Sequence, residues 1–191
     1  MIVDPSLIVS FKDQKGWEEW LSKNYARQEG AWLKLFKKGS NVVSINYAEA
    51  LDVALCYGWI DGQLKKLDDI SRVQRFTPRR KKSVWSQRNT EHIERLTKEG
   101  RMKPSGIAEV ERAKADGRWE KAYASPANTI APNDFIKAID ANKKAKEFWE
   151  TLNKTNRYAM IWQMNDAKKP ETRERKINKF VKMLEQKEKL Y

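Results

Sequence analysis

The sequence predicts an α+β protein in which a small antiparallel sheet is covered by helices and is followed by an all-helical C-terminal module. Segments that alternate apolar and polar residues occur only before residue 80, among segments with helical spacing. A stretch rich in proline, asparagine and alanine, residues 124–133, then interrupts the chain. We expect an α+β unit over residues 1–123, a linker or surface loop over 124–133, and a helical module over 134–191.

The elements of the first unit follow from local patterns. Apolar residues at helical spacing predict helices over residues 16–26, 47–57, about 90–98 and 104–115. Alternation predicts strands over residues 31–37, 59–67 and 71–76, with Asp68 and Asp69 in the turn between the last two. Ser83 is predicted to cap a short helical turn that runs through Trp85, ahead of a helix that starts at Asn89 or Thr90.

The C-terminal module is predicted to hold four helices, which begin near Asn133, Asn142, Thr155 and Pro170. The last three carry large apolar residues at helical spacing. Because fewer than about 70 residues rarely form a stable core alone, we expect the module to dock onto the first unit. Trp149 or Trp162 should then contact residues before Ala124.

Composition favours an anionic partner. The 191 residues include 39 Lys or Arg and 26 Asp or Glu, which gives a net charge of +13. Residues 1–62 carry net −1 and the rest net +14, so the basic excess lies in the later two thirds. The one cysteine, Cys56, can form no internal disulfide. We see neither a secretory signal nor a run of the roughly 20 apolar residues that span a bilayer, so we expect a cytoplasmic protein.

The segment from Cys56 to Asn89 combines aromatic rings with basic side chains. Between Ser71 and Thr90 there are seven Lys or Arg and no Asp or Glu. Rings offer stacking faces, and guanidinium groups offer paired donors to phosphate or carboxylate. A helix that starts directly after the basic run would add free backbone N–H groups. We predict a ligand site formed by Trp59, Asp61, Arg75, Arg79, Ser83, Trp85 and Arg88.

The sequence assigns no catalytic residue, metal or cofactor. Cys56 ends an apolar helical face and is predicted to pack in the core rather than act as a nucleophile. Ser83, Ser86 and His92 do not form the G-x-S-x-G pattern of a hydrolase nucleophile, and His92 is predicted to lie on a solvated helix face. One His and one Cys cannot build a usual zinc site, and no glycine-rich phosphate loop is present.

Several segments resemble the bacterial YdeI/OmpD-associated, or bacteriocin-protection, family. They are A-L-C-Y-G-W-I-D-G at 54–62, Q-R-F-T-P-R at 74–79, S-V-W-S-Q-R-N at 83–89, G-R-M-K-P-S-G at 100–106, A-K-A-D-G-R-W at 113–119 and K-K-P-E-T-R-E-R-K-I at 168–177. The resemblance implies a role in resistance to bacteriocins or antimicrobial peptides. It implies no catalytic residues.

Three functions fit these observations. The first is a cytoplasmic binding protein for an anionic ligand, in a family linked by name to bacteriocin resistance. The second is a nucleic-acid-binding protein that uses the basic surface of residues 72–103 and the C-terminal helices. The third is an enzyme acting on a phosphorylated or carboxylated metabolite, with Asp61 as acid or base and arginines as clamps.

Overall fold

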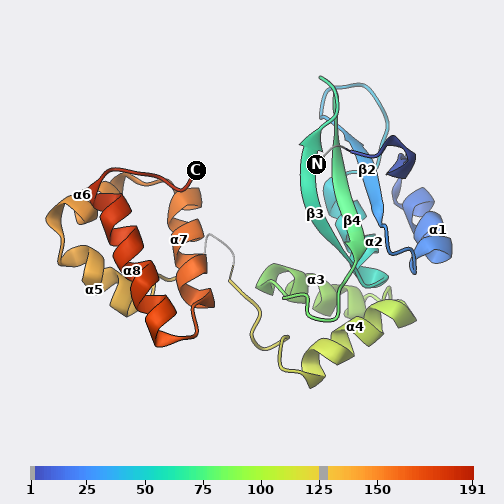
Figure 1. The fold of residues 1–191 in the computed structure, drawn as a ribbon. Helices are drawn as coiled ribbons and strands as arrows, with labels where there is room; N and C mark the ends of the chain where they lie inside the picture. Colours follow the sequence, from blue (N-terminus) through green and yellow to red (C-terminus); the bar gives the residue numbers. More distant parts are fainter. Residues whose placement is uncertain (1–2, 125–128) are drawn as a thin grey trace. The chain divides into compact units, whose positions relative to one another are not determined.

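A computed structural model describes residues 3–124 and 129–191 of the chain. The chain divides into two compact units, Met1–Tyr123 and Ala124–Tyr191. The α+β class predicted from the sequence is confirmed: the sheet lies in unit 1, and unit 2 contains helices (Figure 1). Part of the predicted loop at 124–133, residues 125–128, lies outside the described residues. The predicted docking of the helical module stays a prediction.

Unit 1 begins with a 3₁₀ turn, alternates strands with helices as far as α2, and continues with two strands and then two helices. In chain order its elements are η1 (Pro5–Leu7), β1 (Ile8–Val9), α1 (Gln14–Asn24), β2 (Ala31–Phe36), α2 (Tyr47–Cys56), β3 (Trp59–Lys66), β4 (Ser71–Pro78), α3 (Gln87–Lys98) and α4 (Pro104–Ala115).

The sheet has four strands in the order β1-β2-β4-β3. The three longer strands pair antiparallel, as predicted. The two-residue strand β1 pairs parallel with β2, so the sheet is mixed rather than purely antiparallel. Two residues are too few to show alternation, which is why the sequence did not reveal this strand. The β3–β4 ladder is irregular between Asp61 and Leu64, which bends the edge strand.

The core of unit 1 lies between one face of the sheet and helix α2. Ala31, Leu33 and Phe76 point to this face, and α2 buries an almost continuous apolar run from Ala50 to Cys56. Helix α2 starts with a reciprocal capping box, in which Asn46 accepts from the N–H of Glu49 and Glu49 accepts from the N–H of Asn46. The capping box therefore sets the start of α2 and the position of its first residue, Tyr47.

Helix α3 starts earlier than the sequence suggested. Its N-cap is Ser86, whose Oγ accepts from the N–H of Asn89, and its first residue is Gln87. The predicted helical turn at Ser83 is absent. Ser83 Oγ instead accepts from the N–H of Arg80 and closes a turn over residues 80–83. The cause is a tertiary contact: Tyr123 pairs by backbone hydrogen bonds with Trp85 and Gln87, which holds residues 84–86 extended.

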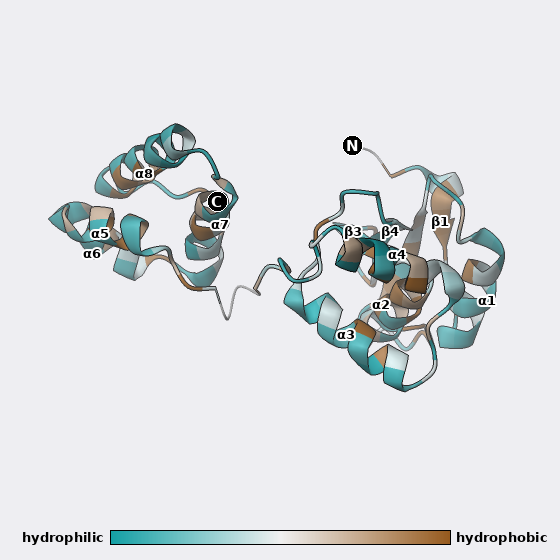
Figure 2. Ribbon diagram, turned by 90° about the horizontal axis from the view of Figure 1, so that it is seen from below, coloured by the Kyte–Doolittle hydropathy of each residue, from teal (hydrophilic) through white to brown (hydrophobic). Residues whose placement is uncertain are grey.

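The described residues of unit 2, 124 and 129–191, pack four helices around an apolar core. They are α5 (Asn133–Asp140), α6 (Lys143–Thr151), α7 (Lys154–Asp166) and α8 (Pro170–Glu185). Figure 2 shows apolar segments on α7 and α8, and Phe135, Met164 and Phe180 are buried. Asn156 is buried and ties down the chain end, because its Oδ1 accepts from the N–H groups of Leu190 and Tyr191. Trp162, which the sequence placed on the apolar stripe, is 42% exposed within the structure described.

No helix among the described residues has both the length and the apolar character that crossing a bilayer requires.

Candidate functional site

Two of the predicted ligand residues, Asp61 and Arg88, meet at a small polar pocket in unit 1. The cavity has a volume of about 240 Å³. Its polar lining consists of Tyr47, Asp61, Ser86, Arg88, Asn89 and Tyr123. Leu51, Ile60 and Val84 complete the wall. We call this cavity the Asp61 pocket; it lies where the start of α2, strand β3 and the start of α3 come together.

Asp61 is held in the pocket by Tyr47. The Tyr47 hydroxyl donates to Oδ2 of Asp61 at 2.9 Å. Burial, followed by the negative charge of Asp61, raises the pKa of Tyr47 well above its ordinary value. Tyr47 therefore remains protonated at neutral pH and continues to donate. Among the described residues, Oδ1 of Asp61 has no hydrogen-bond partner, so it is left as an acceptor for a ligand donor.

The opposite wall of the Asp61 pocket is the first turn of α3. Ser86 caps this turn, and Asn89 is buried beneath it. A helix start carries partial positive charge from its N–H groups. The exposed Arg88 side chain adds a full positive charge, and within the described part of the chain it forms neither an ion pair nor a hydrogen bond. The pocket thus presents a carboxylate acceptor on one side and positive charge on the other.

Tyr123, the last residue of unit 1 in the sequence, also lines the Asp61 pocket. Its backbone N–H donates to the carbonyl of Trp85, and its carbonyl accepts from the N–H of Gln87, both at 2.9 Å. These bonds form an isolated parallel bridge between Ser86 and Tyr123. The bridge fixes both the start of α3 and the position of the Tyr123 ring at the pocket.

Arg79 and Trp85 pack behind the pocket rather than into it. The Arg79 guanidinium carbon lies 3.4 Å from the centre of the Trp85 ring, and Nη1 donates to the carbonyl of Val84 at 3.2 Å. Burial lowers the pKa of Arg79 to about 10, and the negative charge of Glu109 opposes that effect. Only 6% of Arg79 is exposed. The pair supports the segment that leads to Ser86, and neither residue lines the pocket.

The other three predicted residues lie away from the Asp61 pocket. Trp59 has 0% exposure and lies in the core, where its Nε1 donates to the carbonyl of Tyr25 at 2.7 Å. Arg75 points to the opposite face of the sheet, over the ring of Trp32. Ser83 closes the turn described above. We therefore leave Trp59, Arg75 and Ser83 out of the proposed ligand contacts.

Sequence reasoning missed four of the six polar pocket residues: Tyr47, Ser86, Asn89 and Tyr123. Ser86 and Asn89 stood inside the segment that had been singled out, and the Ser-x-x-Asn spacing at a helix start is a signal that could have identified them. Tyr47 and Tyr123 join the site only through tertiary contacts, for which the sequence has no local signal.

Cys56 and His92 have structural surroundings. Cys56 is buried, and burial raises the pKa of its thiol to about 11, so the thiolate is not available near neutral pH. His92 Nδ1 lies 2.8 Å from Oδ1 of Asp52, and Arg95 Nη2 contacts both oxygens of Asp52, at 2.7 and 2.6 Å. His92 therefore takes part in a network between α2 and α3, and the prediction that it lies on a solvated helix face is wrong.

Two family models match the chain, one in each unit. Residues 9–109 match the family described as Domain of unknown function (DUF8412), which covers more than half of the chain. Residues 128–187 match the family described as Bacteriocin-protection, YdeI or OmpD-Associated. The resemblance to that family is thus confirmed for the C-terminal segment, whereas the motifs at 54–62, 74–79, 83–89 and 100–106 fall within the first match. No curated protein and no solved structure matches the chain.

Proposed function

Because the chain belongs to the family of this domain of unknown function and carries a segment of the bacteriocin-protection, YdeI or OmpD-associated family, we propose that unit 1 binds a small anionic ligand in the Asp61 pocket. The ligand carries an acidic group together with a hydrogen-bond donor, such as a hydroxyl or an ammonium group. The family name connects the C-terminal segment with bacteriocin protection. The bound ligand would be the signal or metabolite on which that role depends.

The observation that carries the proposal is that one cavity holds both a negatively charged hydrogen-bond acceptor and a positive charge. Oδ1 of Asp61 requires a donor, and Arg88 with the start of α3 favours an anion. A simple anion would face repulsion from Asp61, and a simple cation would face repulsion from Arg88. A ligand with both groups meets both demands. The volume of about 240 Å³ lies below the roughly 300–1,000 Å³ of typical ligand pockets, so the Asp61 pocket admits only a small metabolite.

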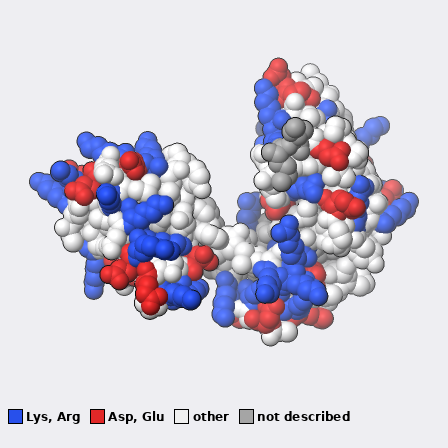
Figure 3. Space-filling view, in the orientation of Figure 1, with Lys and Arg blue, Asp and Glu red and all other residues white. Residues whose placement is uncertain are grey.

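The nucleic-acid alternative is weakened by the way the basic residues of 72–103 are distributed. Arg95 and Arg101 pair with acidic residues, at 2.6 Å to Asp52 and 3.2 Å to Glu99 respectively. Arg79 is buried. On the face drawn in Figure 3, blue and red side chains are interspersed over unit 1. On this face the cations therefore do not form one continuous track for a phosphate backbone.

The proposal is tested by calorimetric titration of the full chain with small compounds that carry an anionic group, a hydroxyl group or both. Glycerol 3-phosphate and lactate carry an anion and a hydroxyl, methyl phosphate and acetate carry only the anion, and glycerol carries only hydroxyls. We expect compounds with both groups to bind tightest. A compound present at 100 times its Kd should raise stability by about 2.7 kcal/mol, which thermal unfolding can detect.

Two variants and two controls locate the binding. Arg88→Gln and Asp61→Asn should each weaken it about tenfold or more, since each removes a charge-assisted contact. Arg80→Gln and Asp69→Asn change the charge equally at exposed positions outside the pocket and should leave binding unchanged. Failure of the whole panel to bind saturably would refute the proposal, as would equal effects in variants and controls.

A further inference from the structure

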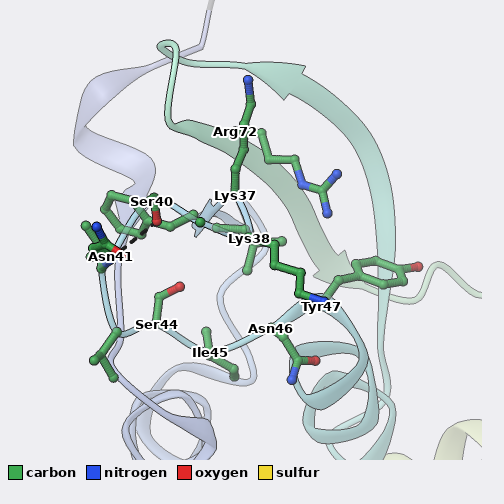
Figure 4. A pocket seen from close by; sticks show the side chains of 14 residues that line it. Lys37, Lys38, Ser40, Asn41, Ser44, Ile45, Asn46, Tyr47 and Arg72 are labelled. Atoms are coloured by element: carbon green, nitrogen blue, oxygen red, sulfur yellow. Dashed lines mark hydrogen bonds between the residues drawn. The ribbon is translucent and has the colours of Figure 1, made fainter.

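A second cavity of unit 1 lies on the other side of Tyr47, between the end of β2 and the start of α2. Its volume is about 630 Å³. The irregular segment from Lys37 to Asn46 forms most of its wall, and Arg72 of β4 contributes the rest of its charged lining (Figure 4). We call it the Lys38 groove.

The Lys38 groove carries positive charge without a compensating acid. Lys37, Lys38 and Arg72 line it, and none of its 14 lining residues is Asp or Glu. The nearby acids already have partners: Asp68 lies 3.6 Å from Lys34, and Asp69 lies 2.7 Å from Lys66. Within residues 3–124 and 129–191, no ion pair involves the three groove cations. Unpaired cations around a concavity concentrate anions there.

Two of the three groove cations, Lys38 and Arg72, extend to the same side of the groove. Figure 4 shows the side chains of Lys38 and Arg72 extending toward the side of the groove where Tyr47 lies. Two basic groups on one side of the groove suit an anion with more than one negative charge, such as a phosphate or diphosphate, better than a single carboxylate. Ser40 and Ser44 line the opposite side of the groove and offer hydroxyl donors there.

The remaining wall of the groove is apolar. Phe36, Val42, Val43 and Ile45 line it, and Val43 remains 78% exposed. An exposed valine beside lysines favours a ligand that has an apolar or aromatic part next to its charge. We propose that the Lys38 groove is a second ligand site, for a phosphorylated small molecule with an apolar or aromatic moiety, such as a nucleoside phosphate.

The proposal goes beyond the Asp61 pocket and is tested separately from it. Titration calorimetry of the full chain with ADP, inorganic pyrophosphate and adenosine measures how much the phosphate groups and the nucleoside each contribute to binding. ADP should bind tightest, pyrophosphate more weakly, and adenosine weakest. The double variant Lys38→Gln with Arg72→Gln should raise the Kd of ADP and pyrophosphate about tenfold or more.

The matched control is the double variant Arg80→Gln with Lys81→Gln, which removes the same charge from an exposed turn outside the groove. It should leave the Kd within about twofold, because surface charges away from a site contribute little. Arg88→Gln should also leave it unchanged, which separates this site from the Asp61 pocket.

Three outcomes would overturn the proposal. They are the absence of saturable binding by ADP and pyrophosphate, equal loss in both double variants, and loss in Arg88→Gln alone. Binding of vesicles containing phosphatidylglycerol, with no binding of the soluble phosphates, would likewise overturn it in favour of a membrane contact.

Discussion

Helix α4 approaches the end of α2 so closely that Gly106 can be replaced only at a cost. A Cβ atom at Gly106 would lie 2.1 Å from the carbonyl oxygen of Cys56 and 3.0 Å from that of Leu55. The same contact carries two hydrogen bonds, because the N–H of Lys103 donates to Cys56 and Ser105 Oγ donates to the carbonyl of Tyr57. The substitution Gly106→Ala therefore forces two backbones apart.

The expected cost follows from three contributions. Overpacking a core by one carbon costs about 1–3 kcal/mol, and weakening the Lys103 hydrogen bond adds about 1 kcal/mol. Alanine returns up to about 1 kcal/mol as the better helix former. The net loss in the free energy of unfolding is about 2 kcal/mol, which for a unit of this size lowers the Tm by roughly 5–10 °C.

Tryptophan fluorescence during thermal and urea unfolding measures this loss, because six of the eight tryptophans lie in residues 1–123. The control is Gly62→Ala, whose Cβ would lie at an ordinary 3.6 Å from Arg75. It should change the Tm far less. A Gly106→Ala protein as stable as the unaltered chain would refute the packing argument.

Three other predictions concern Cys56, the two units and nucleic acid. Burial raises the pKa of Cys56 to about 11 from 9.0, so the native thiol holds its proton more tightly than the unfolded one. Stability should fall between those pH values, by at most about 1.4 kcal/mol per pH unit. Cys56→Ala should remove that part of the slope in urea unfolding, and an unchanged slope would contradict the assignment. A chain ending at Ala124 should melt at a lower temperature than unit 1 of the full chain if the helical module docks, whereas equal melting temperatures would show independent units. Fluorescence anisotropy on single strands should give a shallow salt dependence; a slope near −0.7 per phosphate over several phosphates would favour the nucleic-acid alternative.

The fold could be predicted from the sequence where local pattern decides it. The apolar run of α2 and the Asn46 capping position are readable in the chain, and the structure places the helix over Tyr47–Cys56. The start of α3 is different, because residues 84–86 stay extended through their pairing with Tyr123. A contact over such a sequence distance leaves no local signal.

The candidate site was predictable only where a local sequence pattern marks its residues. Asp61 and Arg88 stood out as charges beside a turn and a helix start, and both line the pocket. Arg79 and Trp85 have the composition of a ligand contact but stack on each other instead, through a cation–π contact between the guanidinium and the indole ring. Residue type alone does not distinguish an arginine and a tryptophan that contact a ligand from a pair that stacks in the protein interior.

The central claim, that the Asp61 pocket holds the ligand, is tested most directly by two-dimensional ¹H–¹⁵N NMR of the full chain titrated with glycerol 3-phosphate. We predict saturable shifts of the backbone amides of Tyr47, Asp61 and residues 86–89, absent in Arg88→Gln and retained in Arg80→Gln. Shifts confined to other parts of the chain, or shifts that grow linearly without saturation, would contradict the claim.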